Sequence, residues 1–120
     1  MSNFKIDIEE KSNIHVVNLK GYLDAHTAGD LERVLQTLID EKKYKIVVNC
    51  KDLSFICSAG LGVFMAYIED VRKHEGDIKL SNMSPKVYNV FDLLGFPLLY
   101  DITKDEMDAI KKFSGSEQKL

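Results

Sequence analysis

Apolar and polar residues alternate in two short runs at the start of the chain. FKIDIE at 4–9 places Phe4, Ile6 and Ile8 on one side and charged residues on the other, which predicts a strand with one buried face. IHVVNLKG at 14–21 follows the polar segment EKSN and predicts a second strand. Because the connection is short, we expect the two strands to form an N-terminal hairpin.

The spacing of apolar residues then changes from a period of two to that of a helix. Residues 27–42 carry an apolar stripe, and TAGD at 27–30 predicts a capping box in which the Thr27 hydroxyl caps the helix. KIVVNC at 45–50 is almost continuously apolar, which is typical of a strand covered on both faces.

The remaining chain repeats this alternation of helix and strand. Apolar residues with helical spacing begin at Leu61, after Pro85, and after the capping signal TKDE at 103–106, which predicts three further helices. IKL at 78–80 and PLLYDI at 97–102 predict strands. The order β-β-α-β-α-β-α-β-α predicts an α/β fold with a mixed, mainly parallel sheet of about five strands, and about four helices. We expect one domain over residues 1–113 and a disordered segment at 114–120.

Composition favours a single cytoplasmic domain. The chain is 45% apolar and 29% charged, and its net charge of −3 is spread without a basic stripe, so we expect neither nucleic acid nor a membrane as a partner. No signal peptide or bilayer-spanning stretch is evident. Cys50 and Cys57 have no companion motif, which indicates reduced thiols, and we expect no metal and no cofactor.

The stretch DLSFICSAGLGVF at 52–64 runs from a strand into a helix with small residues between them. Together with GYLDAHTAGD at 21–30 it follows the carboxyl end of a strand, where function in such sheets tends to lie. These two loops are therefore the candidate functional loops.

Ser58 stands at this junction, and several roles are open to it. A serine hydrolase is rejected because CSAGLG lacks the leading glycine of G-x-S-x-G. The sequence also offers no general base for a Ser58 nucleophile. His15 lies in a predicted strand, His74 lies near the far end of the predicted helix, and no third residue is placed to orient His26. A helix cap worth about 1 kcal/mol is the role that spacing alone favours. An attached phosphate is compatible with it, because a helix start favours negative charge.

Cys57 suggests a different chemistry. A thiol near a helix N-terminus can have a lowered pKa and act as a redox sensor. An isolated cysteine at the end of an apolar strand is more often a small buried residue, and no CxxC is present. A redox module that uses Cys57 stays a minor alternative.

Four segments follow one another in an order known from one family. LSFICSAGLGVF is similar to a strand that runs into D-S-[SA]-G-L-G, and GYLDAHTAGDLE to a G-x-L-D-x-x-(S/T) segment. KIVVNCKDLSFI is similar to the same family's central strand, and LSNMSPKVYNVFDLLGF to its later helix. Over most of its length the chain thus resembles the single-domain STAS proteins that are bacterial anti-sigma factor antagonists, which implies the STAS fold.

The resemblance implies a partner switch. In that family the unphosphorylated antagonist binds an anti-sigma factor that is also a serine kinase, and so frees a sigma factor. The kinase uses ATP to phosphorylate the serine that corresponds to Ser58, the complex dissociates, and a PP2C-type phosphatase resets the phosphorylated form. The resemblance therefore implies a regulatory protein that is the substrate of a kinase and is not an enzyme itself.

The resemblance also implies a partner-binding surface. Its expected members are Asp24, Thr27, Cys57, Ser58, Ala59, Gly60, Leu61 and Gly62. Gly60 and Gly62 would let the partner backbone and the phosphate approach closely, and Leu61 would anchor the helix. For Asp24, a purely local role in its loop is an equally open interpretation.

One position departs from the family pattern. The family commonly has Asp immediately before the phosphoacceptor, where this chain has Cys57. The loss of that charge is expected to change kinase recognition or to make phosphoserine easier to hold. A rival interpretation is a STAS scaffold subunit of a signalling or lipid-transport complex, in which Ser58 is not phosphorylated.

Overall fold

Five strands and five helices lie within residues 4–118, the part of the chain that this computed structural model describes. Their order is β1 (Lys5–Lys11), β2 (Ile14–Leu23), α1 (Ala28–Asp40), β3 (Lys45–Ile56), α2 (Ser58–Lys73), β4 (Asp77–Ser81), α3 (Pro85–Leu93), α4 (Phe96–Leu99), β5 (Ile102–Thr103) and α5 (Glu106–Gln118).

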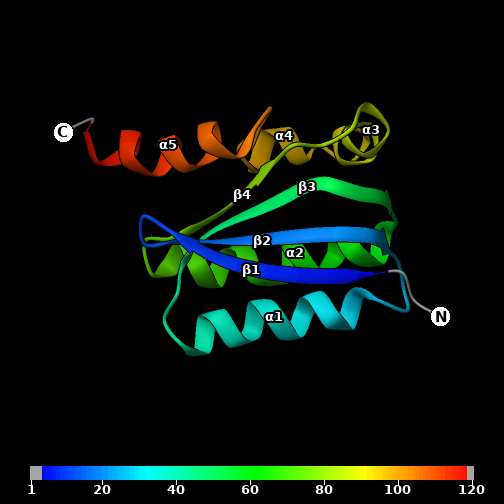
Figure 1. The fold of residues 1–120 in the computed structure, drawn as a ribbon, viewed down its shortest axis with the longest axis horizontal. Coiled ribbons are helices and arrows are strands. Elements are labelled where there is room, and N and C mark those ends of the chain that lie inside the picture. The colour runs from blue at the N-terminus through cyan, green and yellow to red at the C-terminus, as the bar shows by residue number, and fades with distance from the viewer. Residues whose placement is uncertain (1–3, 119–120) are drawn as a thin grey trace.

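One five-stranded sheet organises these elements, in the order β1-β2-β3-β4-β5. β1 and β2 form an antiparallel hairpin, and the other neighbouring strands run parallel. In Figure 1, α1 and α2 lie below the sheet, and α3, α4 and α5 lie above it. The predicted α/β fold with an N-terminal hairpin and a mixed, mainly parallel sheet is confirmed.

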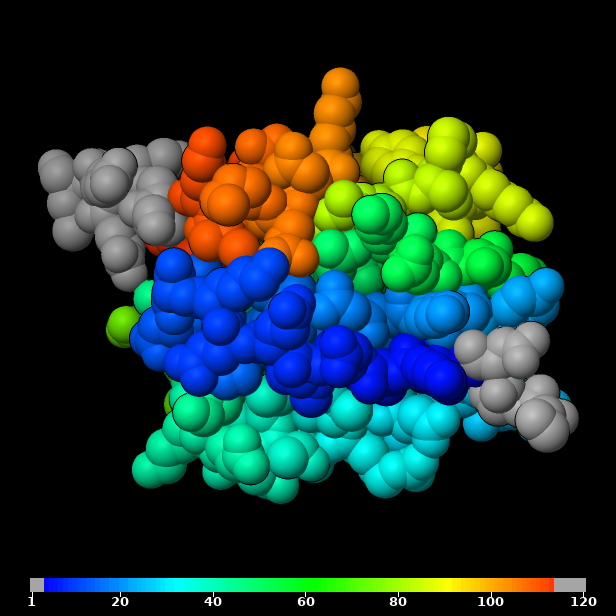
Figure 2. All heavy atoms as spheres, viewed as in Figure 1, coloured from blue at the N-terminus to red at the C-terminus, as the bar shows by residue number. Residues whose placement is uncertain are grey.

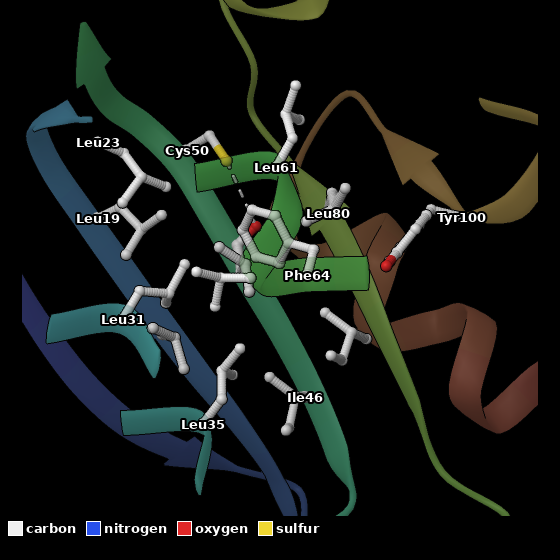
Figure 3. Packing of buried hydrophobic residues seen from close by; sticks show 14 of the residues in the cluster. Leu19, Leu23, Leu31, Leu35, Ile46, Cys50, Leu61, Phe64, Leu80 and Tyr100 are labelled. Carbon is white, nitrogen blue, oxygen red and sulfur yellow. Dashed lines mark hydrogen bonds between the residues drawn. The ribbon is translucent and has the colours of Figure 1, made fainter. Parts of the chain in front are cut away.

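The main core lies between the sheet and the helices α1 and α2. Figure 3 shows its side chains pointing toward one another from β2 (Leu19, Leu23), α1 (Leu31, Leu35), β3 (Ile46, Cys50) and α2 (Phe64). Leu61 of α2 belongs to the same cluster. A smaller cluster on the other face joins β2 and β3 to Ala109, Ile110 and Phe113 of α5. Both faces of β2 and β3 are thus covered, as the continuous apolar run of β3 predicts.

The predicted strand at 97–102 is mostly wrong. Residues 96–99 form the short helix α4, and only Ile102 and Thr103 pair with β4. Gly95, with φ +77°, turns the chain between α3 and α4, and Pro97 occupies the first turn of α4, where a proline is tolerated. Leu98 is 91% exposed, so this apolar run does not indicate a buried strand.

The start of α5 also differs from expectation. The Asp105 carboxylate, not Thr103, caps the helix by accepting from the amide of Asp108 at 2.8 Å. The Thr103 hydroxyl donates to the Asp105 carbonyl at 2.8 Å instead. The backbone of residues 114–118 continues α5, whereas residues 119 and 120 of the expected disordered segment lie outside the described residues. The domain boundary at residue 113 stays a prediction.

A buried lysine ties the far edge of the sheet to α5. Lys79 is 4% exposed, and its ammonium group donates to Asp77 at 3.0 Å and to Asp101 at 2.6 Å. It also lies 4.7 Å from the ring centroid of Phe113. The hydrogen bond from Lys79 holds the pKa of Asp101 below its usual range.

Across residues 4–118, no helix combines the length and apolar character needed to cross a membrane.

Candidate functional site

The two candidate loops meet at one end of the sheet. Leu23 and Ile56 are the last paired residues of the parallel strands β2 and β3. The amide of Cys57 then donates to the Leu23 carbonyl at 3.0 Å, which joins the start of α2 to the end of β2. The segments that carry Asp24 and Ser58 therefore begin side by side, as expected for loops after neighbouring parallel strands.

The loop after β2 is organised by Asp24 and Thr27. An Asp24 carboxylate oxygen accepts from the amides of His26 at 2.9 Å and Thr27 at 3.2 Å. The Thr27 hydroxyl donates to the Tyr22 carbonyl at 2.8 Å and accepts from the Asp24 amide at 2.9 Å. Thr27 is buried, whereas Asp24 is half-buried.

This geometry corrects the role expected of Thr27. Thr27 immediately precedes α1, but its side chain makes no capping hydrogen bond, because its hydroxyl is engaged with the loop behind it. The predicted capping box is therefore wrong. At 4% exposure Thr27 is also poorly placed to contact a partner directly, so its contribution is to fix the loop that carries Asp24.

Thr27→Val is expected to destabilise the protein by about 2 kcal/mol. Valine keeps the shape of the side chain but leaves the Tyr22 carbonyl and the Asp24 amide without the hydroxyl that both contact. Urea unfolding measures the change. Thr27→Ser keeps the hydroxyl and should lose only about 1 kcal/mol for the missing methyl group. Equal losses in the two variants would show that the hydroxyl has no special role.

Ser58 occupies the first position of α2 and not the cap. The capping position belongs to Cys57, whose backbone is extended with φ −119° and ψ 178°, so the helix begins one residue earlier than it would with Ser58 as its cap. The Ser58 side chain is exposed, and within the described residues its hydroxyl makes no hydrogen bond. The Ser58 hydroxyl is thus not required for any hydrogen bond among the described residues.

The residues after Ser58 divide into exposed and buried positions. Gly60 and Leu61 are buried, and a Cβ on Gly60 would lie 2.6 Å from Leu23 Cγ and 3.2 Å from Ile56. The close approach that Gly60 permits is therefore between α2 and the sheet, not with a partner. Leu61 is part of the main core and anchors α2 there, in line with its expected role.

Gly62 differs from Gly60 in its surroundings. It is exposed, and a Cβ built on it would meet nothing within 4 Å. Ala59 and Cys57 are half-buried. The accessible part of the candidate surface therefore consists of Asp24, Cys57, Ser58, Ala59 and Gly62.

An exposed aromatic pair beside this surface was missed at the level of sequence. Tyr22 and Phe55 are register partners on β2 and β3, they are 53% and 39% exposed, and their ring centroids are 5.6 Å apart. Each directly precedes a buried last strand residue, Leu23 or Ile56, so the two-residue period places both rings on the opposite face. That alternation is the signal that could have found them.

Two other reactive side chains lie apart from this surface. Cys50 is fully buried in β3, and burial raises the pKa of its thiol to about 12, so it is a packing residue. His74 follows the end of α2, at the opposite end of the 16-residue helix from Ser58, so it cannot serve Ser58 as a base.

Comparison with known proteins agrees with this architecture. The STAS domain profile matches residues 5–109. The anti-sigma-B factor antagonist of Bacillus subtilis is 33% identical over 101 residues, which cover 84% of this chain and 92% of that protein. A solved anti-sigma factor antagonist from Mycobacterium paratuberculosis has a TM-score of 0.86 at 20% identity, covering 93% and 95% of the two chains.

A second solved structure is that of a phosphorylated protein. It is the Bacillus cell fate determinant SpoIIAA in its phosphorylated form, with a TM-score of 0.70 at 25% identity, covering 90% of this chain and 98% of that one. The family profile spans all five strands of the sheet and the helices α1 to α4, and the relatives match over most of their length. By fold and by sequence, this chain belongs to the STAS domain family.

Proposed function

We propose that this protein is an anti-sigma factor antagonist controlled by phosphorylation of Ser58. The unphosphorylated form binds an anti-sigma factor that is also a serine kinase, and so frees a sigma factor. Phosphorylation of Ser58 by that kinase dissociates the complex, and a PP2C-type phosphatase removes the phosphate. The observation that carries the proposal is the exposed hydroxyl of Ser58, without an internal hydrogen bond, beside the Asp24 loop in a chain similar to such antagonists.

The position of Ser58 suits a switch that leaves the fold unchanged. Phosphorylation adds roughly −1.5 to −2 charges at neutral pH. At the first residue of α2 this charge faces the positive end of the helix dipole, so folding should be almost unaffected. Neither Asp24 nor Cys57 carries a positive charge that could neutralise the phosphate.

The same charge should oppose a docked partner. The accessible surface is small and mixed: Asp24 is acidic, Ala59 and Gly62 are small, and the Tyr22–Phe55 pair offers apolar contact area next to them. A hydrated phosphate in the middle of such a surface must be desolvated or opposed when the partner binds. A cost of about 1.4 kcal/mol already weakens binding tenfold, so a local charge suffices without a conformational change.

Cys57 makes the surface atypical for a kinase. Where relatives with the D-S motif carry a carboxylate, this chain has a half-buried, uncharged thiol next to the acceptor. The kinase that acts on this protein is therefore expected to depend less on an acidic residue directly before the serine. The protein itself acts as substrate and binding partner and carries out no catalytic step.

The test is phosphate transfer and binding with purified serine-kinase anti-sigma factors and ATP. Intact mass should show one added phosphate on the wild type and on Ser54→Ala, a control at an exposed serine on β3, and none on Ser58→Ala. The phosphorylated wild type should bind the same kinase at least about tenfold more weakly in calorimetry. If Ser58→Ala still takes up phosphate, or if the folded wild type takes up none from any such kinase, the proposal fails and the scaffold role replaces it.

A further inference from the structure

The edge strand β1 leaves apolar side chains uncovered. β1 is the first strand of the sheet order and pairs only with β2 within the described residues. Its even-numbered residues face the α1 side, but Ile6 is only half-buried and Ile8 is 44% exposed, so the predicted burial of Ile8 is wrong. A groove separates α1 from these residues, and Figure 2 shows β1 as a dark blue band across the viewed face above α1.

A groove runs between this edge and α1. Its volume is about 570 Å³, and its apolar lining consists of Phe4, Ile6 and Ile8 from the strand side and Val34 and Leu38 from α1. A sheet edge also presents unpaired backbone amides and carbonyls. An added strand would form hydrogen bonds with these groups and cover the apolar residues of the groove. The combination is a template for another strand with alternating apolar residues.

The charges on the other face of β1 indicate which strand that is. Lys5 stands opposite Lys20 of β2, a like-charged pair that is unfavourable across neighbouring strands. Asp7 stands opposite Asn18, and both Lys5 and Asp7 are exposed. A strand added at the unpaired edge of β1 would be favoured if it placed an acidic residue opposite Lys5 and a basic residue opposite Asp7.

We propose that β1 pairs antiparallel with β1 of a second copy of this chain, about a twofold axis at Ile6. In this register Lys5 lies opposite Asp7 of the other copy in two symmetric pairs. On the groove face Ile6 lies opposite Ile6, and Phe4 lies opposite Ile8. In this register each β1 strand places an opposite charge against Lys5 and Asp7 of the other copy and an apolar residue against Phe4, Ile6 and Ile8.

Two neighbouring registers fit less well. An axis at Asp7 pairs Lys5 with Glu9, but it places Asp7 opposite Asp7 on the axis and the apolar Phe4 opposite the charged Glu10. An axis at Ile8 places Lys5 opposite Lys11 and Asp7 opposite Glu9, which are repulsive on both sides of the axis. Glu10 also points to the groove face, 3.8 Å from His15, and so disfavours pairing at the second half of the strand.

The paired form is compatible with the candidate site. β1 lies at the sheet edge, while Ser58 lies beyond the carboxyl end of β3, two strands away. The sheet becomes continuous across the two copies, and both Ser58 surfaces stay accessible. The inference does not depend on the proposed function, since pairing is measured without any partner.

Sedimentation velocity over a series of concentrations tests the pairing. Lys5→Glu and Asp7→Lys each convert two attractive pairs into repulsive ones and should weaken dimerisation at least about tenfold. The exchange Lys5→Asp with Asp7→Lys restores opposite charges between copies and should return the affinity to near that of the wild type. A wild type that stays monomeric at every concentration, or an exchange variant as weak as the single variants, overturns the proposal.

Cysteine cross-linking tests the register, with Cys57→Ser as the background. Residues directly opposite in antiparallel strands have Cα atoms about 4.5–5.5 Å apart, which a disulfide can bridge. Ile6→Cys, on the axis, should form a covalent dimer under mild oxidation. Ile8→Cys, which faces Phe4 of the other copy, should not. Cross-linking of Ile8→Cys alone, or of neither variant, overturns this register.

Discussion

Gly60→Ala is expected to destabilise the protein by about 2 kcal/mol, because the new methyl group would overlap the core beneath the candidate site. Its Cβ would lie 2.6 Å from Leu23 Cγ and 2.9 Å from Leu23 Cδ2. Leu23 is fully buried and cannot swing away into solvent, so α2 must move off the sheet. Urea unfolding should show the loss as a lower midpoint at an unchanged slope.

Gly62→Ala is the matched control two residues along the same helix. Nothing lies within 4 Å of a Cβ at Gly62, so alanine should add helix propensity and stabilise by up to about 1 kcal/mol. If Ser58 is the phosphoacceptor, Gly60→Ala should also slow its phosphorylation, since a displaced α2 carries Ser58 with it. Equal stability of the two variants would contradict the tight contact between Gly60 and Leu23.

The sheet could be predicted from the sequence because its signals are local and repeated. The alternation at 4–9 and 14–21 and the continuous apolar run at 45–50 specify strands by period and burial alone. α4 could not be predicted in this way. Pro97, Leu98 and Leu99 read as an apolar strand, but the left-handed turn at Gly95 and the exposure of both leucines follow from how α3 ends.

The site was predicted in position but not in detail. That Asp24 and Ser58 come together follows from the parallel pairing of β2 with β3, which the order of elements indicates. The roles of single side chains depend on distances between segments far apart in sequence. Thr27 bonds backward to Tyr22 and not forward to its helix, and Gly60 packs on Leu23 and not on a partner. Sequence spacing contains neither fact.

Uncovered β1 residues illustrate a further limit. Alternation assigns Ile8 to the buried face, and the side is correct, but how far α1 extends beneath the edge depends on the packing of whole elements. Whether apolar residues on a strand are fully or only partly covered is known only when the packing of the helices on the sheet is known. It is also the feature from which the pairing of two copies is inferred.

Gly76→Ala is expected to be the most destabilising of these substitutions, at about 3 kcal/mol. A Cβ on Gly76 would lie 2.0 Å from the carbonyl oxygen of Tyr44 and 2.6 Å from its carbonyl carbon. These are backbone atoms, and the same carbonyl accepts from the Asp77 amide at 2.9 Å where β4 begins beside β3. Either the turn after α2 or the start of β3 must shift, and the stacking of His74 on Tyr44, at 4.3 Å between ring centroids, would shift with it.

Gly29→Ala provides the control, because its nearest neighbour would be Arg33 at an ordinary 3.6 Å, so its stability should be unchanged or slightly higher.

Gly76 lies at the end of α2 opposite Ser58, so Gly76→Ala separates global stability from the site. At temperatures where it remains folded, it should be phosphorylated and bound like the wild type, whereas Gly60→Ala should not. If both variants lose partner binding in proportion to their lost stability, the buried contact of Gly60 has no specific role at the site. If only Gly60→Ala loses it, the packing of α2 on Leu23 is what holds Ser58 in place for its partner.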